Sequence, residues 1–247
     1  MKYKEFPILL QPFRLDDFDT LISIANGDVF YGSAVVEAAY ELCVFSPEGW
    51  ILHQSQFSIN PFQKIVISLA QLNLDCNSGL FTLKKLSGIS SGHFYTTFKH
   101  LKGNNSFVVH SHQVFDWNDP GLSHRLYIKL LNALSFRLNP SLKSLRKIAI
   151  PPIGDLSNKK IEIFVYNKST VYDKLYIAFV DNQSRIFSRV IGLPGHHSRI
   201  ISVSHLLKTV DLEVSGIYLK PMYGYASSKP LIFHYSRDNK LICLHHA

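Results

Sequence analysis

The stretches INPFQKIVISLAQL (residues 59–72) and LPGHHSRIISVSHLL (residues 193–207) decide the fold. Each contains a turn signal with proline, a pair of polar residues, a short aliphatic run and a segment that carries leucines. Short aliphatic runs bounded by turn residues are typical of β-strands. Because the same order occurs twice along the chain, the sequence predicts two β-domains of similar build.

Two further pairs of stretches extend this parallel. SGLFTLK (78–84) resembles SGIYLK (215–220), and SFVVHSH (106–112) resembles PLIFHYS (230–236). The last pair places His110 opposite His234. We therefore interpret the chain as a duplication, with the alternative that any two antiparallel sheets yield apolar runs that can be aligned.

Runs rich in Val, Ile, Phe and Tyr also recur along both halves, separated by Gly, Pro, Asn, Asp and Ser. Their spacing predicts a mainly β fold of two tandem antiparallel β-sandwich domains of jelly-roll type. The predicted strands are 34–45, 51–59, 64–69, 79–85, 93–99, 105–112, 160–166, 174–180, 185–193, 199–204, 215–220, 230–236 and 240–245.

The domain organisation follows from these runs. Residues 1–30 are expected to form an arm that packs on a first sandwich, residues 31–122, and residues 156–247 form the second sandwich. Between them, residues 123–155 are predicted to be a basic linker. A short amphipathic helix over 124–138 is expected there, with Ser123 as N-cap and a stripe of leucines packed on a neighbouring domain. That stripe consists of Leu126, Leu130, Leu134 and Leu138.

Positive charge is concentrated near the middle of the chain. The 247 residues carry a net charge of +8, and residues 126–160 hold 7 basic residues against 1 acidic residue. Such a stretch attracts anions, so an acidic protein partner or an anionic glycan is expected. Few aromatics and no known nucleic-acid motif occur there, which argues against nucleic acid. The predicted partner-binding residues are Lys129, Arg137, Lys143, Arg146 and Lys147.

Other global features indicate a soluble protein. No apolar run approaches the 18 or so residues of a membrane span, and the N-terminal stretch does not match a signal peptide. Cys43, Cys76 and Cys243 show no CxxC spacing, which fits a reducing compartment. We therefore expect a cytoplasmic protein that is able to form homo-oligomers.

A histidine-rich stretch, FVVHSHQVFDWNDPGLSHR (107–125), is the sharpest candidate for chemistry. His110 and His112 share one face of a strand, and Asp116 or His124 would complete a site for iron, manganese, nickel or zinc. The alternative is that His110 is an ordinary half-buried strand histidine. No Walker A loop, GxGxxG, GxSxG or HExxH motif occurs.

This stretch resembles the first motif of the cupin family. The matching residues are Gly103, His110, His112, Asp116 and Gly121, although six residues separate Gly103 from His110 and an aspartate replaces the usual glutamate. LPGHH (193–197) is similar to the second motif. The resemblance implies a jelly-roll metalloenzyme with a facial set of histidine and carboxylate ligands.

A second candidate site lies in LPGHHSR (193–199), where histidines and an arginine follow a Pro-Gly turn. Such donors bind phosphate, sulfate or carboxylate groups. The predicted anion-binding residues are His196, His197, Arg199 and the nearby Arg189. Trp50 and Trp117 also follow turns and could present their rings to a sugar.

These observations favour a non-enzymatic binding or assembly protein. It would engage an acidic protein or an anionic glycan through a cleft between two β-sandwich domains, without a cofactor. The alternative is a metal-dependent, cupin-like enzyme that uses the His-x-His site.

Overall fold

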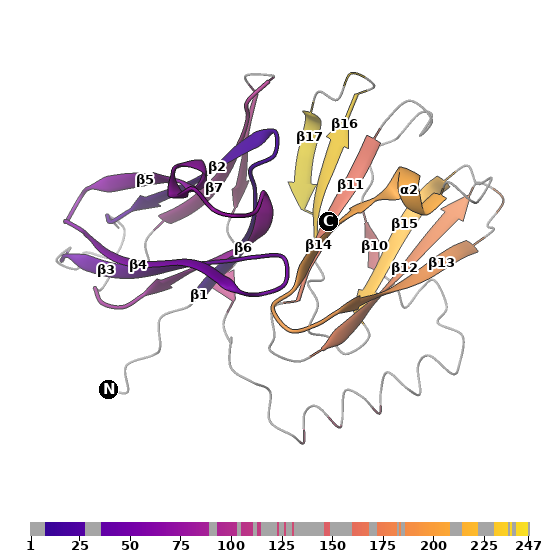
Figure 1. Ribbon diagram of the computed structural model, residues 1–247, viewed down its shortest axis with the longest axis horizontal. Helices are drawn as coiled ribbons and strands as arrows, with labels where there is room; N and C mark the ends of the chain where they lie inside the picture. Colours follow the sequence, from indigo (N-terminus) through magenta and orange to yellow (C-terminus); the bar gives the residue numbers. More distant parts are fainter. Residues whose placement is uncertain are drawn as a thin grey trace. The chain divides into compact units, whose positions relative to one another are not determined.

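The computed structural model of the protein is mainly β and contains four antiparallel sheets (Figure 1). It divides into two compact units, Met1–Trp117 and Asn118–Ala247. The structure describes residues 8–27, 36–88, 93–102, 105–110, 113–114, 123, 126, 130, 146–148, 160–167, 172–181, 183, 186–207, 214–221, 230–236, 238 and 241–246. Each unit is described by itself.

The first unit consists of two sheets. Their strand orders are β4-β3-β6-β1-β9 and β5-β2-β7-β8, and η2 (Leu69–Leu72) follows β5. The strands are β1 (Ile8–Arg14), β2 (Phe18–Ala25), β3 (Ala38–Phe45), β4 (Ile51–Ile59), β5 (Lys64–Ser68), β6 (Ser78–Lys85), β7 (His93–His100), β8 (Ser106–His110) and β9 (Gln113–Val114).

Alternation of side chains builds the core of this unit. In β2 and β3 every second residue is buried, as expected where one face of a strand packs against a second sheet. The buried residues of both sheets form one hydrophobic cluster, which confirms the β-sandwich class for this unit. The cluster includes Leu9, Phe13, Ile22, Ile24, Tyr40, Leu42, Phe81 and Leu83.

The second unit also consists of two sheets, with strand orders β10-β15-β12-β13 and β14-β11-β16-β17. A short helix, α2 (Val203–Leu207), follows β14. The strands are β10 (Arg146–Ile148), β11 (Lys160–Tyr166), β12 (Asp173–Asp181), β13 (Ile186–Leu193), β14 (Ser198–Ser202), β15 (Val214–Pro221), β16 (Leu231–Tyr235) and β17 (Leu241–His246). Its core joins both sheets through Ile161, Ile163, Leu175, Ile177, Phe179, Ile217, Leu219 and Ile232.

The two units share their strand order. The series β4-β3-β6-β1 and β13-β12-β15-β10 have the same sequential arrangement, as do β5-β2-β7-β8 and β14-β11-β16-β17. The stretches 59–72 and 193–207 fall on matching elements. The third aligned pair does not, because β8 corresponds to β17, whereas His234 lies in β16. The match of His110 with His234 is therefore wrong by one strand.

The turn between β4 and β5 matches the turn between β13 and β14 in its geometry. Phe62 and His196, each the third residue of its turn, have positive φ angles of 62° and 58°. Gln63 N–H donates to Asn60 O at 3.2 Å, and His197 N–H donates to Pro194 O at 3.1 Å. Positive φ at this position is characteristic of a type II turn.

A buried asparagine fixes each of these turns. The Asn26 side-chain amide donates to Ile59 O at 2.8 Å, and that of Asn167 donates to Leu193 O at 2.9 Å. Their backbone N–H groups donate to the carbonyl oxygens of Gln63 and His197. The same polar connection thus ties β2 and β11 to the turn beside them.

Two predicted segments are corrected by the sheets. Residues 8–25, expected in an arm, form β1 and β2, and each pairs with a strand on both sides. The first unit therefore begins before residue 31. Residues 146–148 of the predicted linker form β10 and pair with β15.

In the predicted linker helix, the structure describes Ser123, Leu126 and Leu130, and all three are helical. Both leucines are exposed, and the expected packing on a neighbouring domain stays a prediction. Leu134 and Leu138 lie outside the described residues. Within the described part of the chain, no helix has the length and apolar character needed to cross a membrane.

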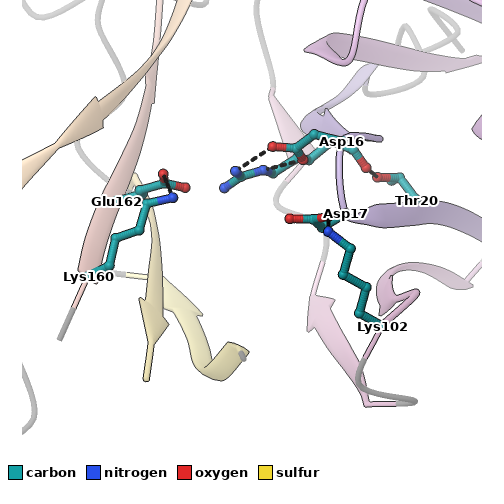
Figure 2. A network of polar contacts seen from close by, with 7 residues as sticks. Asp16, Asp17, Thr20, Lys102, Lys160 and Glu162 are labelled. Atoms are coloured by element: carbon teal, nitrogen blue, oxygen red, sulfur yellow. Dashed lines mark hydrogen bonds and ion pairs between the residues drawn. The ribbon is translucent and has the colours of Figure 1, made fainter. Parts of the chain in front are cut away.

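Ion pairs stabilise chain segments within each unit (Figure 2). In the first unit, Arg14 makes two hydrogen bonds to the Asp16 carboxylate, at 2.7 and 2.6 Å. Lys102 Nζ lies 2.6 Å from Asp17. In the second unit, Lys160 Nζ lies 2.7 Å from Glu162.

Replacing Asp16 by asparagine is expected to reduce stability in a pH-dependent way. Burial acts to raise the pKa of Asp16, but the hydrogen bond and charge of Arg14 lower that pKa below its ordinary value. A lowered folded-state pKa stabilises above the unfolded pKa of about 3.9, and this contribution is lost as the pH falls through the folded pKa. Because the Asp16 side chain is 39% exposed, we expect a loss of about 1 kcal/mol at pH 7.

Urea unfolding at pH 7, 5 and 3 would measure this effect. The difference between Asp16→Asn and the unmodified protein should shrink toward pH 3. Asp75→Asn is the control, since Asp75 is exposed. A difference that stays constant over this pH range would contradict the assignment.

Candidate functional site

The structure describes little of the predicted metal site. His110 is the last residue of β8, and its backbone pairs with Tyr95. His112, Asp116 and His124 lie outside the described residues. Among the residues that are described, no group of three or more His, Cys, Asp or Glu side chains could hold a metal ion. The metal site therefore stays a prediction of the sequence.

The predicted anion site falls on the turn between β13 and β14. His197 Nδ1 lies 2.9 Å from Gly195 O, and the His197 carbonyl accepts a hydrogen bond from Asn167 N–H at 2.8 Å. Burial, together with the charge of His197, lowers the pKa of His196. The neutral imidazole is thereby favoured at His196, which weakens its attraction for an anion.

The two arginines of that set lie on strands of different sheets. Arg199 is exposed on β14, directly after the turn, and pairs with Val165. Arg189 lies on β13 five residues before the turn, and its guanidinium stacks on the Phe187 ring at 4.4 Å from the centroid. The structure therefore gathers His196, His197 and Arg199 along one turn, and it engages Arg189 elsewhere.

Of the predicted partner-binding residues, the structure describes two by their backbone. Arg146 and Lys147 lie in β10, where they pair with Leu219 and Tyr218 of β15. Lys129, Arg137 and Lys143 lie outside the described residues. The register of β10 thus brings one predicted basic residue beside a tyrosine.

That tyrosine belongs to an outward face of the β10-β15-β12-β13 sheet. Leu175 and Ile177 of β12 are core residues, so Lys174 and Tyr176, which alternate with them, face away from the core. By the same alternation Tyr218 faces away, because Ile217 and Leu219 are core residues of β15. Figure 1 shows these strands side by side.

Exposed apolar and aromatic side chains continue this face onto β13. Val190 pairs with Tyr176 and is exposed. Tyr172, directly before β12, is 45% exposed. A Cβ added at Gly192 would lie 2.6 Å from the Tyr172 hydroxyl oxygen, so the glycine lets the phenol approach the sheet backbone.

Lysine positions lie next to these tyrosines in the strand register. Lys174 pairs with Gly192, and the register places Lys220 beside Tyr176 and Lys147 beside Tyr218. Aromatic rings offer a flat apolar surface and a lysine offers positive charge, so the face combines ring packing with ion pairing. We call Tyr172, Lys174, Tyr176, Val190 and Tyr218 the tyrosine–lysine face.

Sequence reasoning missed this face although a signal was present. In DKLYIAFVD (173–181) and VSGIYLKP (214–221) the polar and aromatic residues alternate with aliphatic ones. Alternation alone assigns Tyr176 and Tyr218 to outward positions. Only the strand order shows that β12 and β15 are neighbours, which puts the two tyrosines on one surface.

Comparisons with known proteins do not assign a family. No protein-family model matches the chain, and no curated protein sequence matches it. Among solved structures, a β-glucuronidase from glycoside hydrolase family 2 aligns with 11% identity and a TM-score of 0.18, over 96% of this chain and 23% of that enzyme. The chain thus spans about a quarter of that enzyme's length, and the likeness carries no argument about fold or function.

Proposed function

We propose that the protein is a non-enzymatic binding protein and that it holds an anionic glycan on the tyrosine–lysine face. The observation that carries this proposal is the set of outward residues Lys174, Tyr176 and Tyr218 on adjacent strands of one sheet. The face extends over neighbouring strands and is not an enclosed pocket, which suits an extended chain rather than a small enclosed substrate. The ligand is therefore expected to run across β12 and β15.

The chemistry of the residues supports a sugar with negative groups. A tyrosine ring offers an apolar face for the C–H surface of a sugar, and its hydroxyl donates and accepts hydrogen bonds. A lysine ammonium pairs with carboxylate or sulfate groups. The net charge of +8 favours the approach of polyanions over longer distances.

We also infer that the two units are tandem copies of one sandwich, joined by a basic linker. Support comes from the shared strand order and from the equivalent roles of Asn26 and Asn167 at their turns. A duplication leaves two surfaces at corresponding positions, and these are free to diverge in the ligands they accept.

Isothermal titration of the full chain tests the binding proposal. The probes are a sulfated octasaccharide, an oligouronate of similar length and a single-stranded oligonucleotide. We expect binding to at least one anionic saccharide, weakened by salt, and a loss of about tenfold in affinity for Tyr176→Ala and for Tyr218→Ala.

Tyr95→Ala is the matched control, because Tyr95 is also an outward strand tyrosine but lies in the first unit. It should leave the affinity unchanged. Equal losses in all three variants, or no binding of either saccharide, would contradict the proposal. Tighter binding of the oligonucleotide than of both saccharides would assign the face to nucleic acid instead.

A further inference from the structure

The turn between β3 and β4 presents a tryptophan on a rigid backbone. Ser46 N–H donates to Trp50 O at 2.8 Å, and Gly49 N–H donates to Ser46 O at 3.0 Å. The Ser46 hydroxyl accepts hydrogen bonds from the backbone N–H groups of Glu48 and Trp50, both at 3.2 Å. Although this turn is fixed, the Trp50 side chain is 73% exposed.

Leaving a tryptophan in water on a fixed turn forgoes the stabilisation that its burial would bring. Binding to such a ring requires little further ordering of the backbone, because the turn is already held by hydrogen bonds. Ile51, the next residue, is exposed as well. Trp50 therefore has the properties of a preformed contact surface.

Next to this turn, β3 and β4 carry a cluster of three polar side chains, Glu41, Gln54 and Gln56, which we call the polar fan. The side-chain amides of Gln54 and Gln56 both donate to Glu41 Oε1, at 3.1 and 3.2 Å. Both glutamines are exposed. The amide oxygens of both glutamines and the carboxylate of Glu41 are acceptors, and together they can accept from several hydroxyl groups.

The charge of this surface distinguishes it from the tyrosine–lysine face. Glu41 brings a carboxylate to its centre, with the exposed Lys84 opposite on β6. A carboxylate repels sulfate, phosphate and uronate groups but accepts hydrogen bonds from neutral hydroxyls. Because Glu41 and Lys84 stand opposite each other, their charges offset, and the surface is suited to an uncharged ligand rich in hydroxyl groups.

Its position in the fold is equivalent to part of the tyrosine–lysine face. The pair β3 and β4 occupies the place in the first unit that β12 and β13 occupy in the second. Val190 and Tyr176 stand in register on that second pair, whereas Gln56 and Glu41 stand in register on the first. The same sheet position therefore carries Gln56 and Glu41 in the first unit and Val190 and Tyr176 in the second.

We propose that Trp50, Glu41, Gln54 and Gln56 form a second saccharide-binding surface, which takes a neutral sugar chain. The ring of Trp50 packs against the apolar face of one sugar unit. The polar fan binds hydroxyls of a unit further along, because Gln54 lies four positions after Trp50, roughly 13 Å along an extended chain. This inference goes beyond the proposed function, because it does not require the tyrosine–lysine face to bind anything.

The reactivity of a cysteine, Cys43, can be used to detect binding at this surface. Cys43 lies between Gln54 and Thr82 in the strand register. Burial and then the charge of Glu41 raise the pKa of the Cys43 thiol, and a hydrogen bond with Thr82 opposes them. A sugar bound over the fan should shield this thiol from alkylation.

Glu41→Gln is expected to make Cys43 react faster with iodoacetamide. Removing the negative charge moves the pKa of the thiol back toward its ordinary value, and a larger thiolate fraction reacts faster. Mass spectrometry of the labelled peptide at pH 8 measures the rate. Cys243 serves as the internal control, because it lies in β17 of the second unit, and its rate should not change.

The binding test uses the full chain and neutral hexasaccharides of glucose, xylose, mannose and galactose as probes. We expect one of them to bind, to slow Cys43 alkylation severalfold, and to lose at least tenfold in affinity in Trp50→Ala. Gln54→Ala should weaken binding as well. Phe62→Ala is the control, because Phe62 is 74% exposed on another turn of the same unit.

The possible outcomes separate this inference from the proposed function. Loss of neutral-sugar binding in Trp50→Ala, with anionic binding intact, supports a second surface. Absence of binding to all four hexasaccharides, or equal losses in Trp50→Ala and Phe62→Ala, overturns it. Tyr176→Ala should affect binding of the anionic probes only. The neutral-sugar test therefore gives an answer even if the proposed function is wrong.

Discussion

Gly79→Ala is expected to destabilise the first unit by about 3 kcal/mol or more. Gly79 lies in β6 and pairs with Phe13 of β1. A Cβ at this position would lie 2.1 Å from Phe45 O and 2.8 Å from Cε1 of Phe13. Because one of these atoms belongs to the backbone of a neighbouring strand, side-chain rotation cannot relieve the clash, and the sheet itself must shift.

Gly216→Ala is the matched control for this prediction. Gly216 stands in the corresponding Ser-Gly dipeptide of β15, but its added Cβ would meet only the Tyr218 ring, at 3.0 Å for the nearest atom. A ring edge can move aside, so we expect a loss within about 1 kcal/mol. Scanning calorimetry measures both, with a melting temperature lowered by about 10 °C or more for Gly79→Ala. Equal shifts in the two variants would contradict this account.

Asn26→Ala is expected to lower stability by about 2 to 3 kcal/mol. Asn26 is buried, and its side-chain amide donates to Ile59 O at 2.8 Å and to Val36 O at 2.9 Å. Alanine removes both donors, and the carbonyl oxygens then lose hydrogen bonds that water replaces poorly at a buried site. The turn also holds Phe62 at positive φ, a conformation that costs energy for a bulky residue and depends on its surroundings.

Urea unfolding and amide hydrogen exchange would test this prediction. The N–H of Phe62, which donates to Asn26 O at 2.7 Å, should exchange faster in the variant. Asn60→Ala serves as the control, because Asn60 is exposed at the start of the same turn. If both variants unfold at the same urea concentration, Asn26 does not fix the turn.

Strands flanked by clear turn signals were predictable from composition. The expected strands 51–59, 64–69 and 160–166 agree within one residue with β4, β5 and β11. β1 and β2 were not predicted as strands, since residues 1–30 were assigned to an arm. Proline is uncommon in the interior of a sheet. Pro12 nevertheless pairs with Leu80 inside β1, and FDTLISIA (18–25) alternates clearly enough that it could have been found.

The repeat was predictable only in part, because some of its short apolar runs resemble one another. The Pro-containing turns of 59–72 and 193–207 have distinctive residues, and they fall on matching elements. SFVVH and LIFHY are both short apolar runs that end near a histidine, so composition could not separate them. Strand pairing does so, because β16 lies between β11 and β17 whereas β8 lies at a sheet edge.

The sequence by itself determined the mainly β class, most of the strands, the polar and apolar faces of single strands, and the excess of positive charge. These properties depend on neighbours along the chain, which a periodic pattern records directly. Only the tertiary structure decided that β12 and β15 adjoin, which places Tyr176 and Tyr218 on one surface. β12 and β15 are separated by two other strands along the chain, and which distant strands become neighbours depends on the packing of the whole sheet, which no local pattern records.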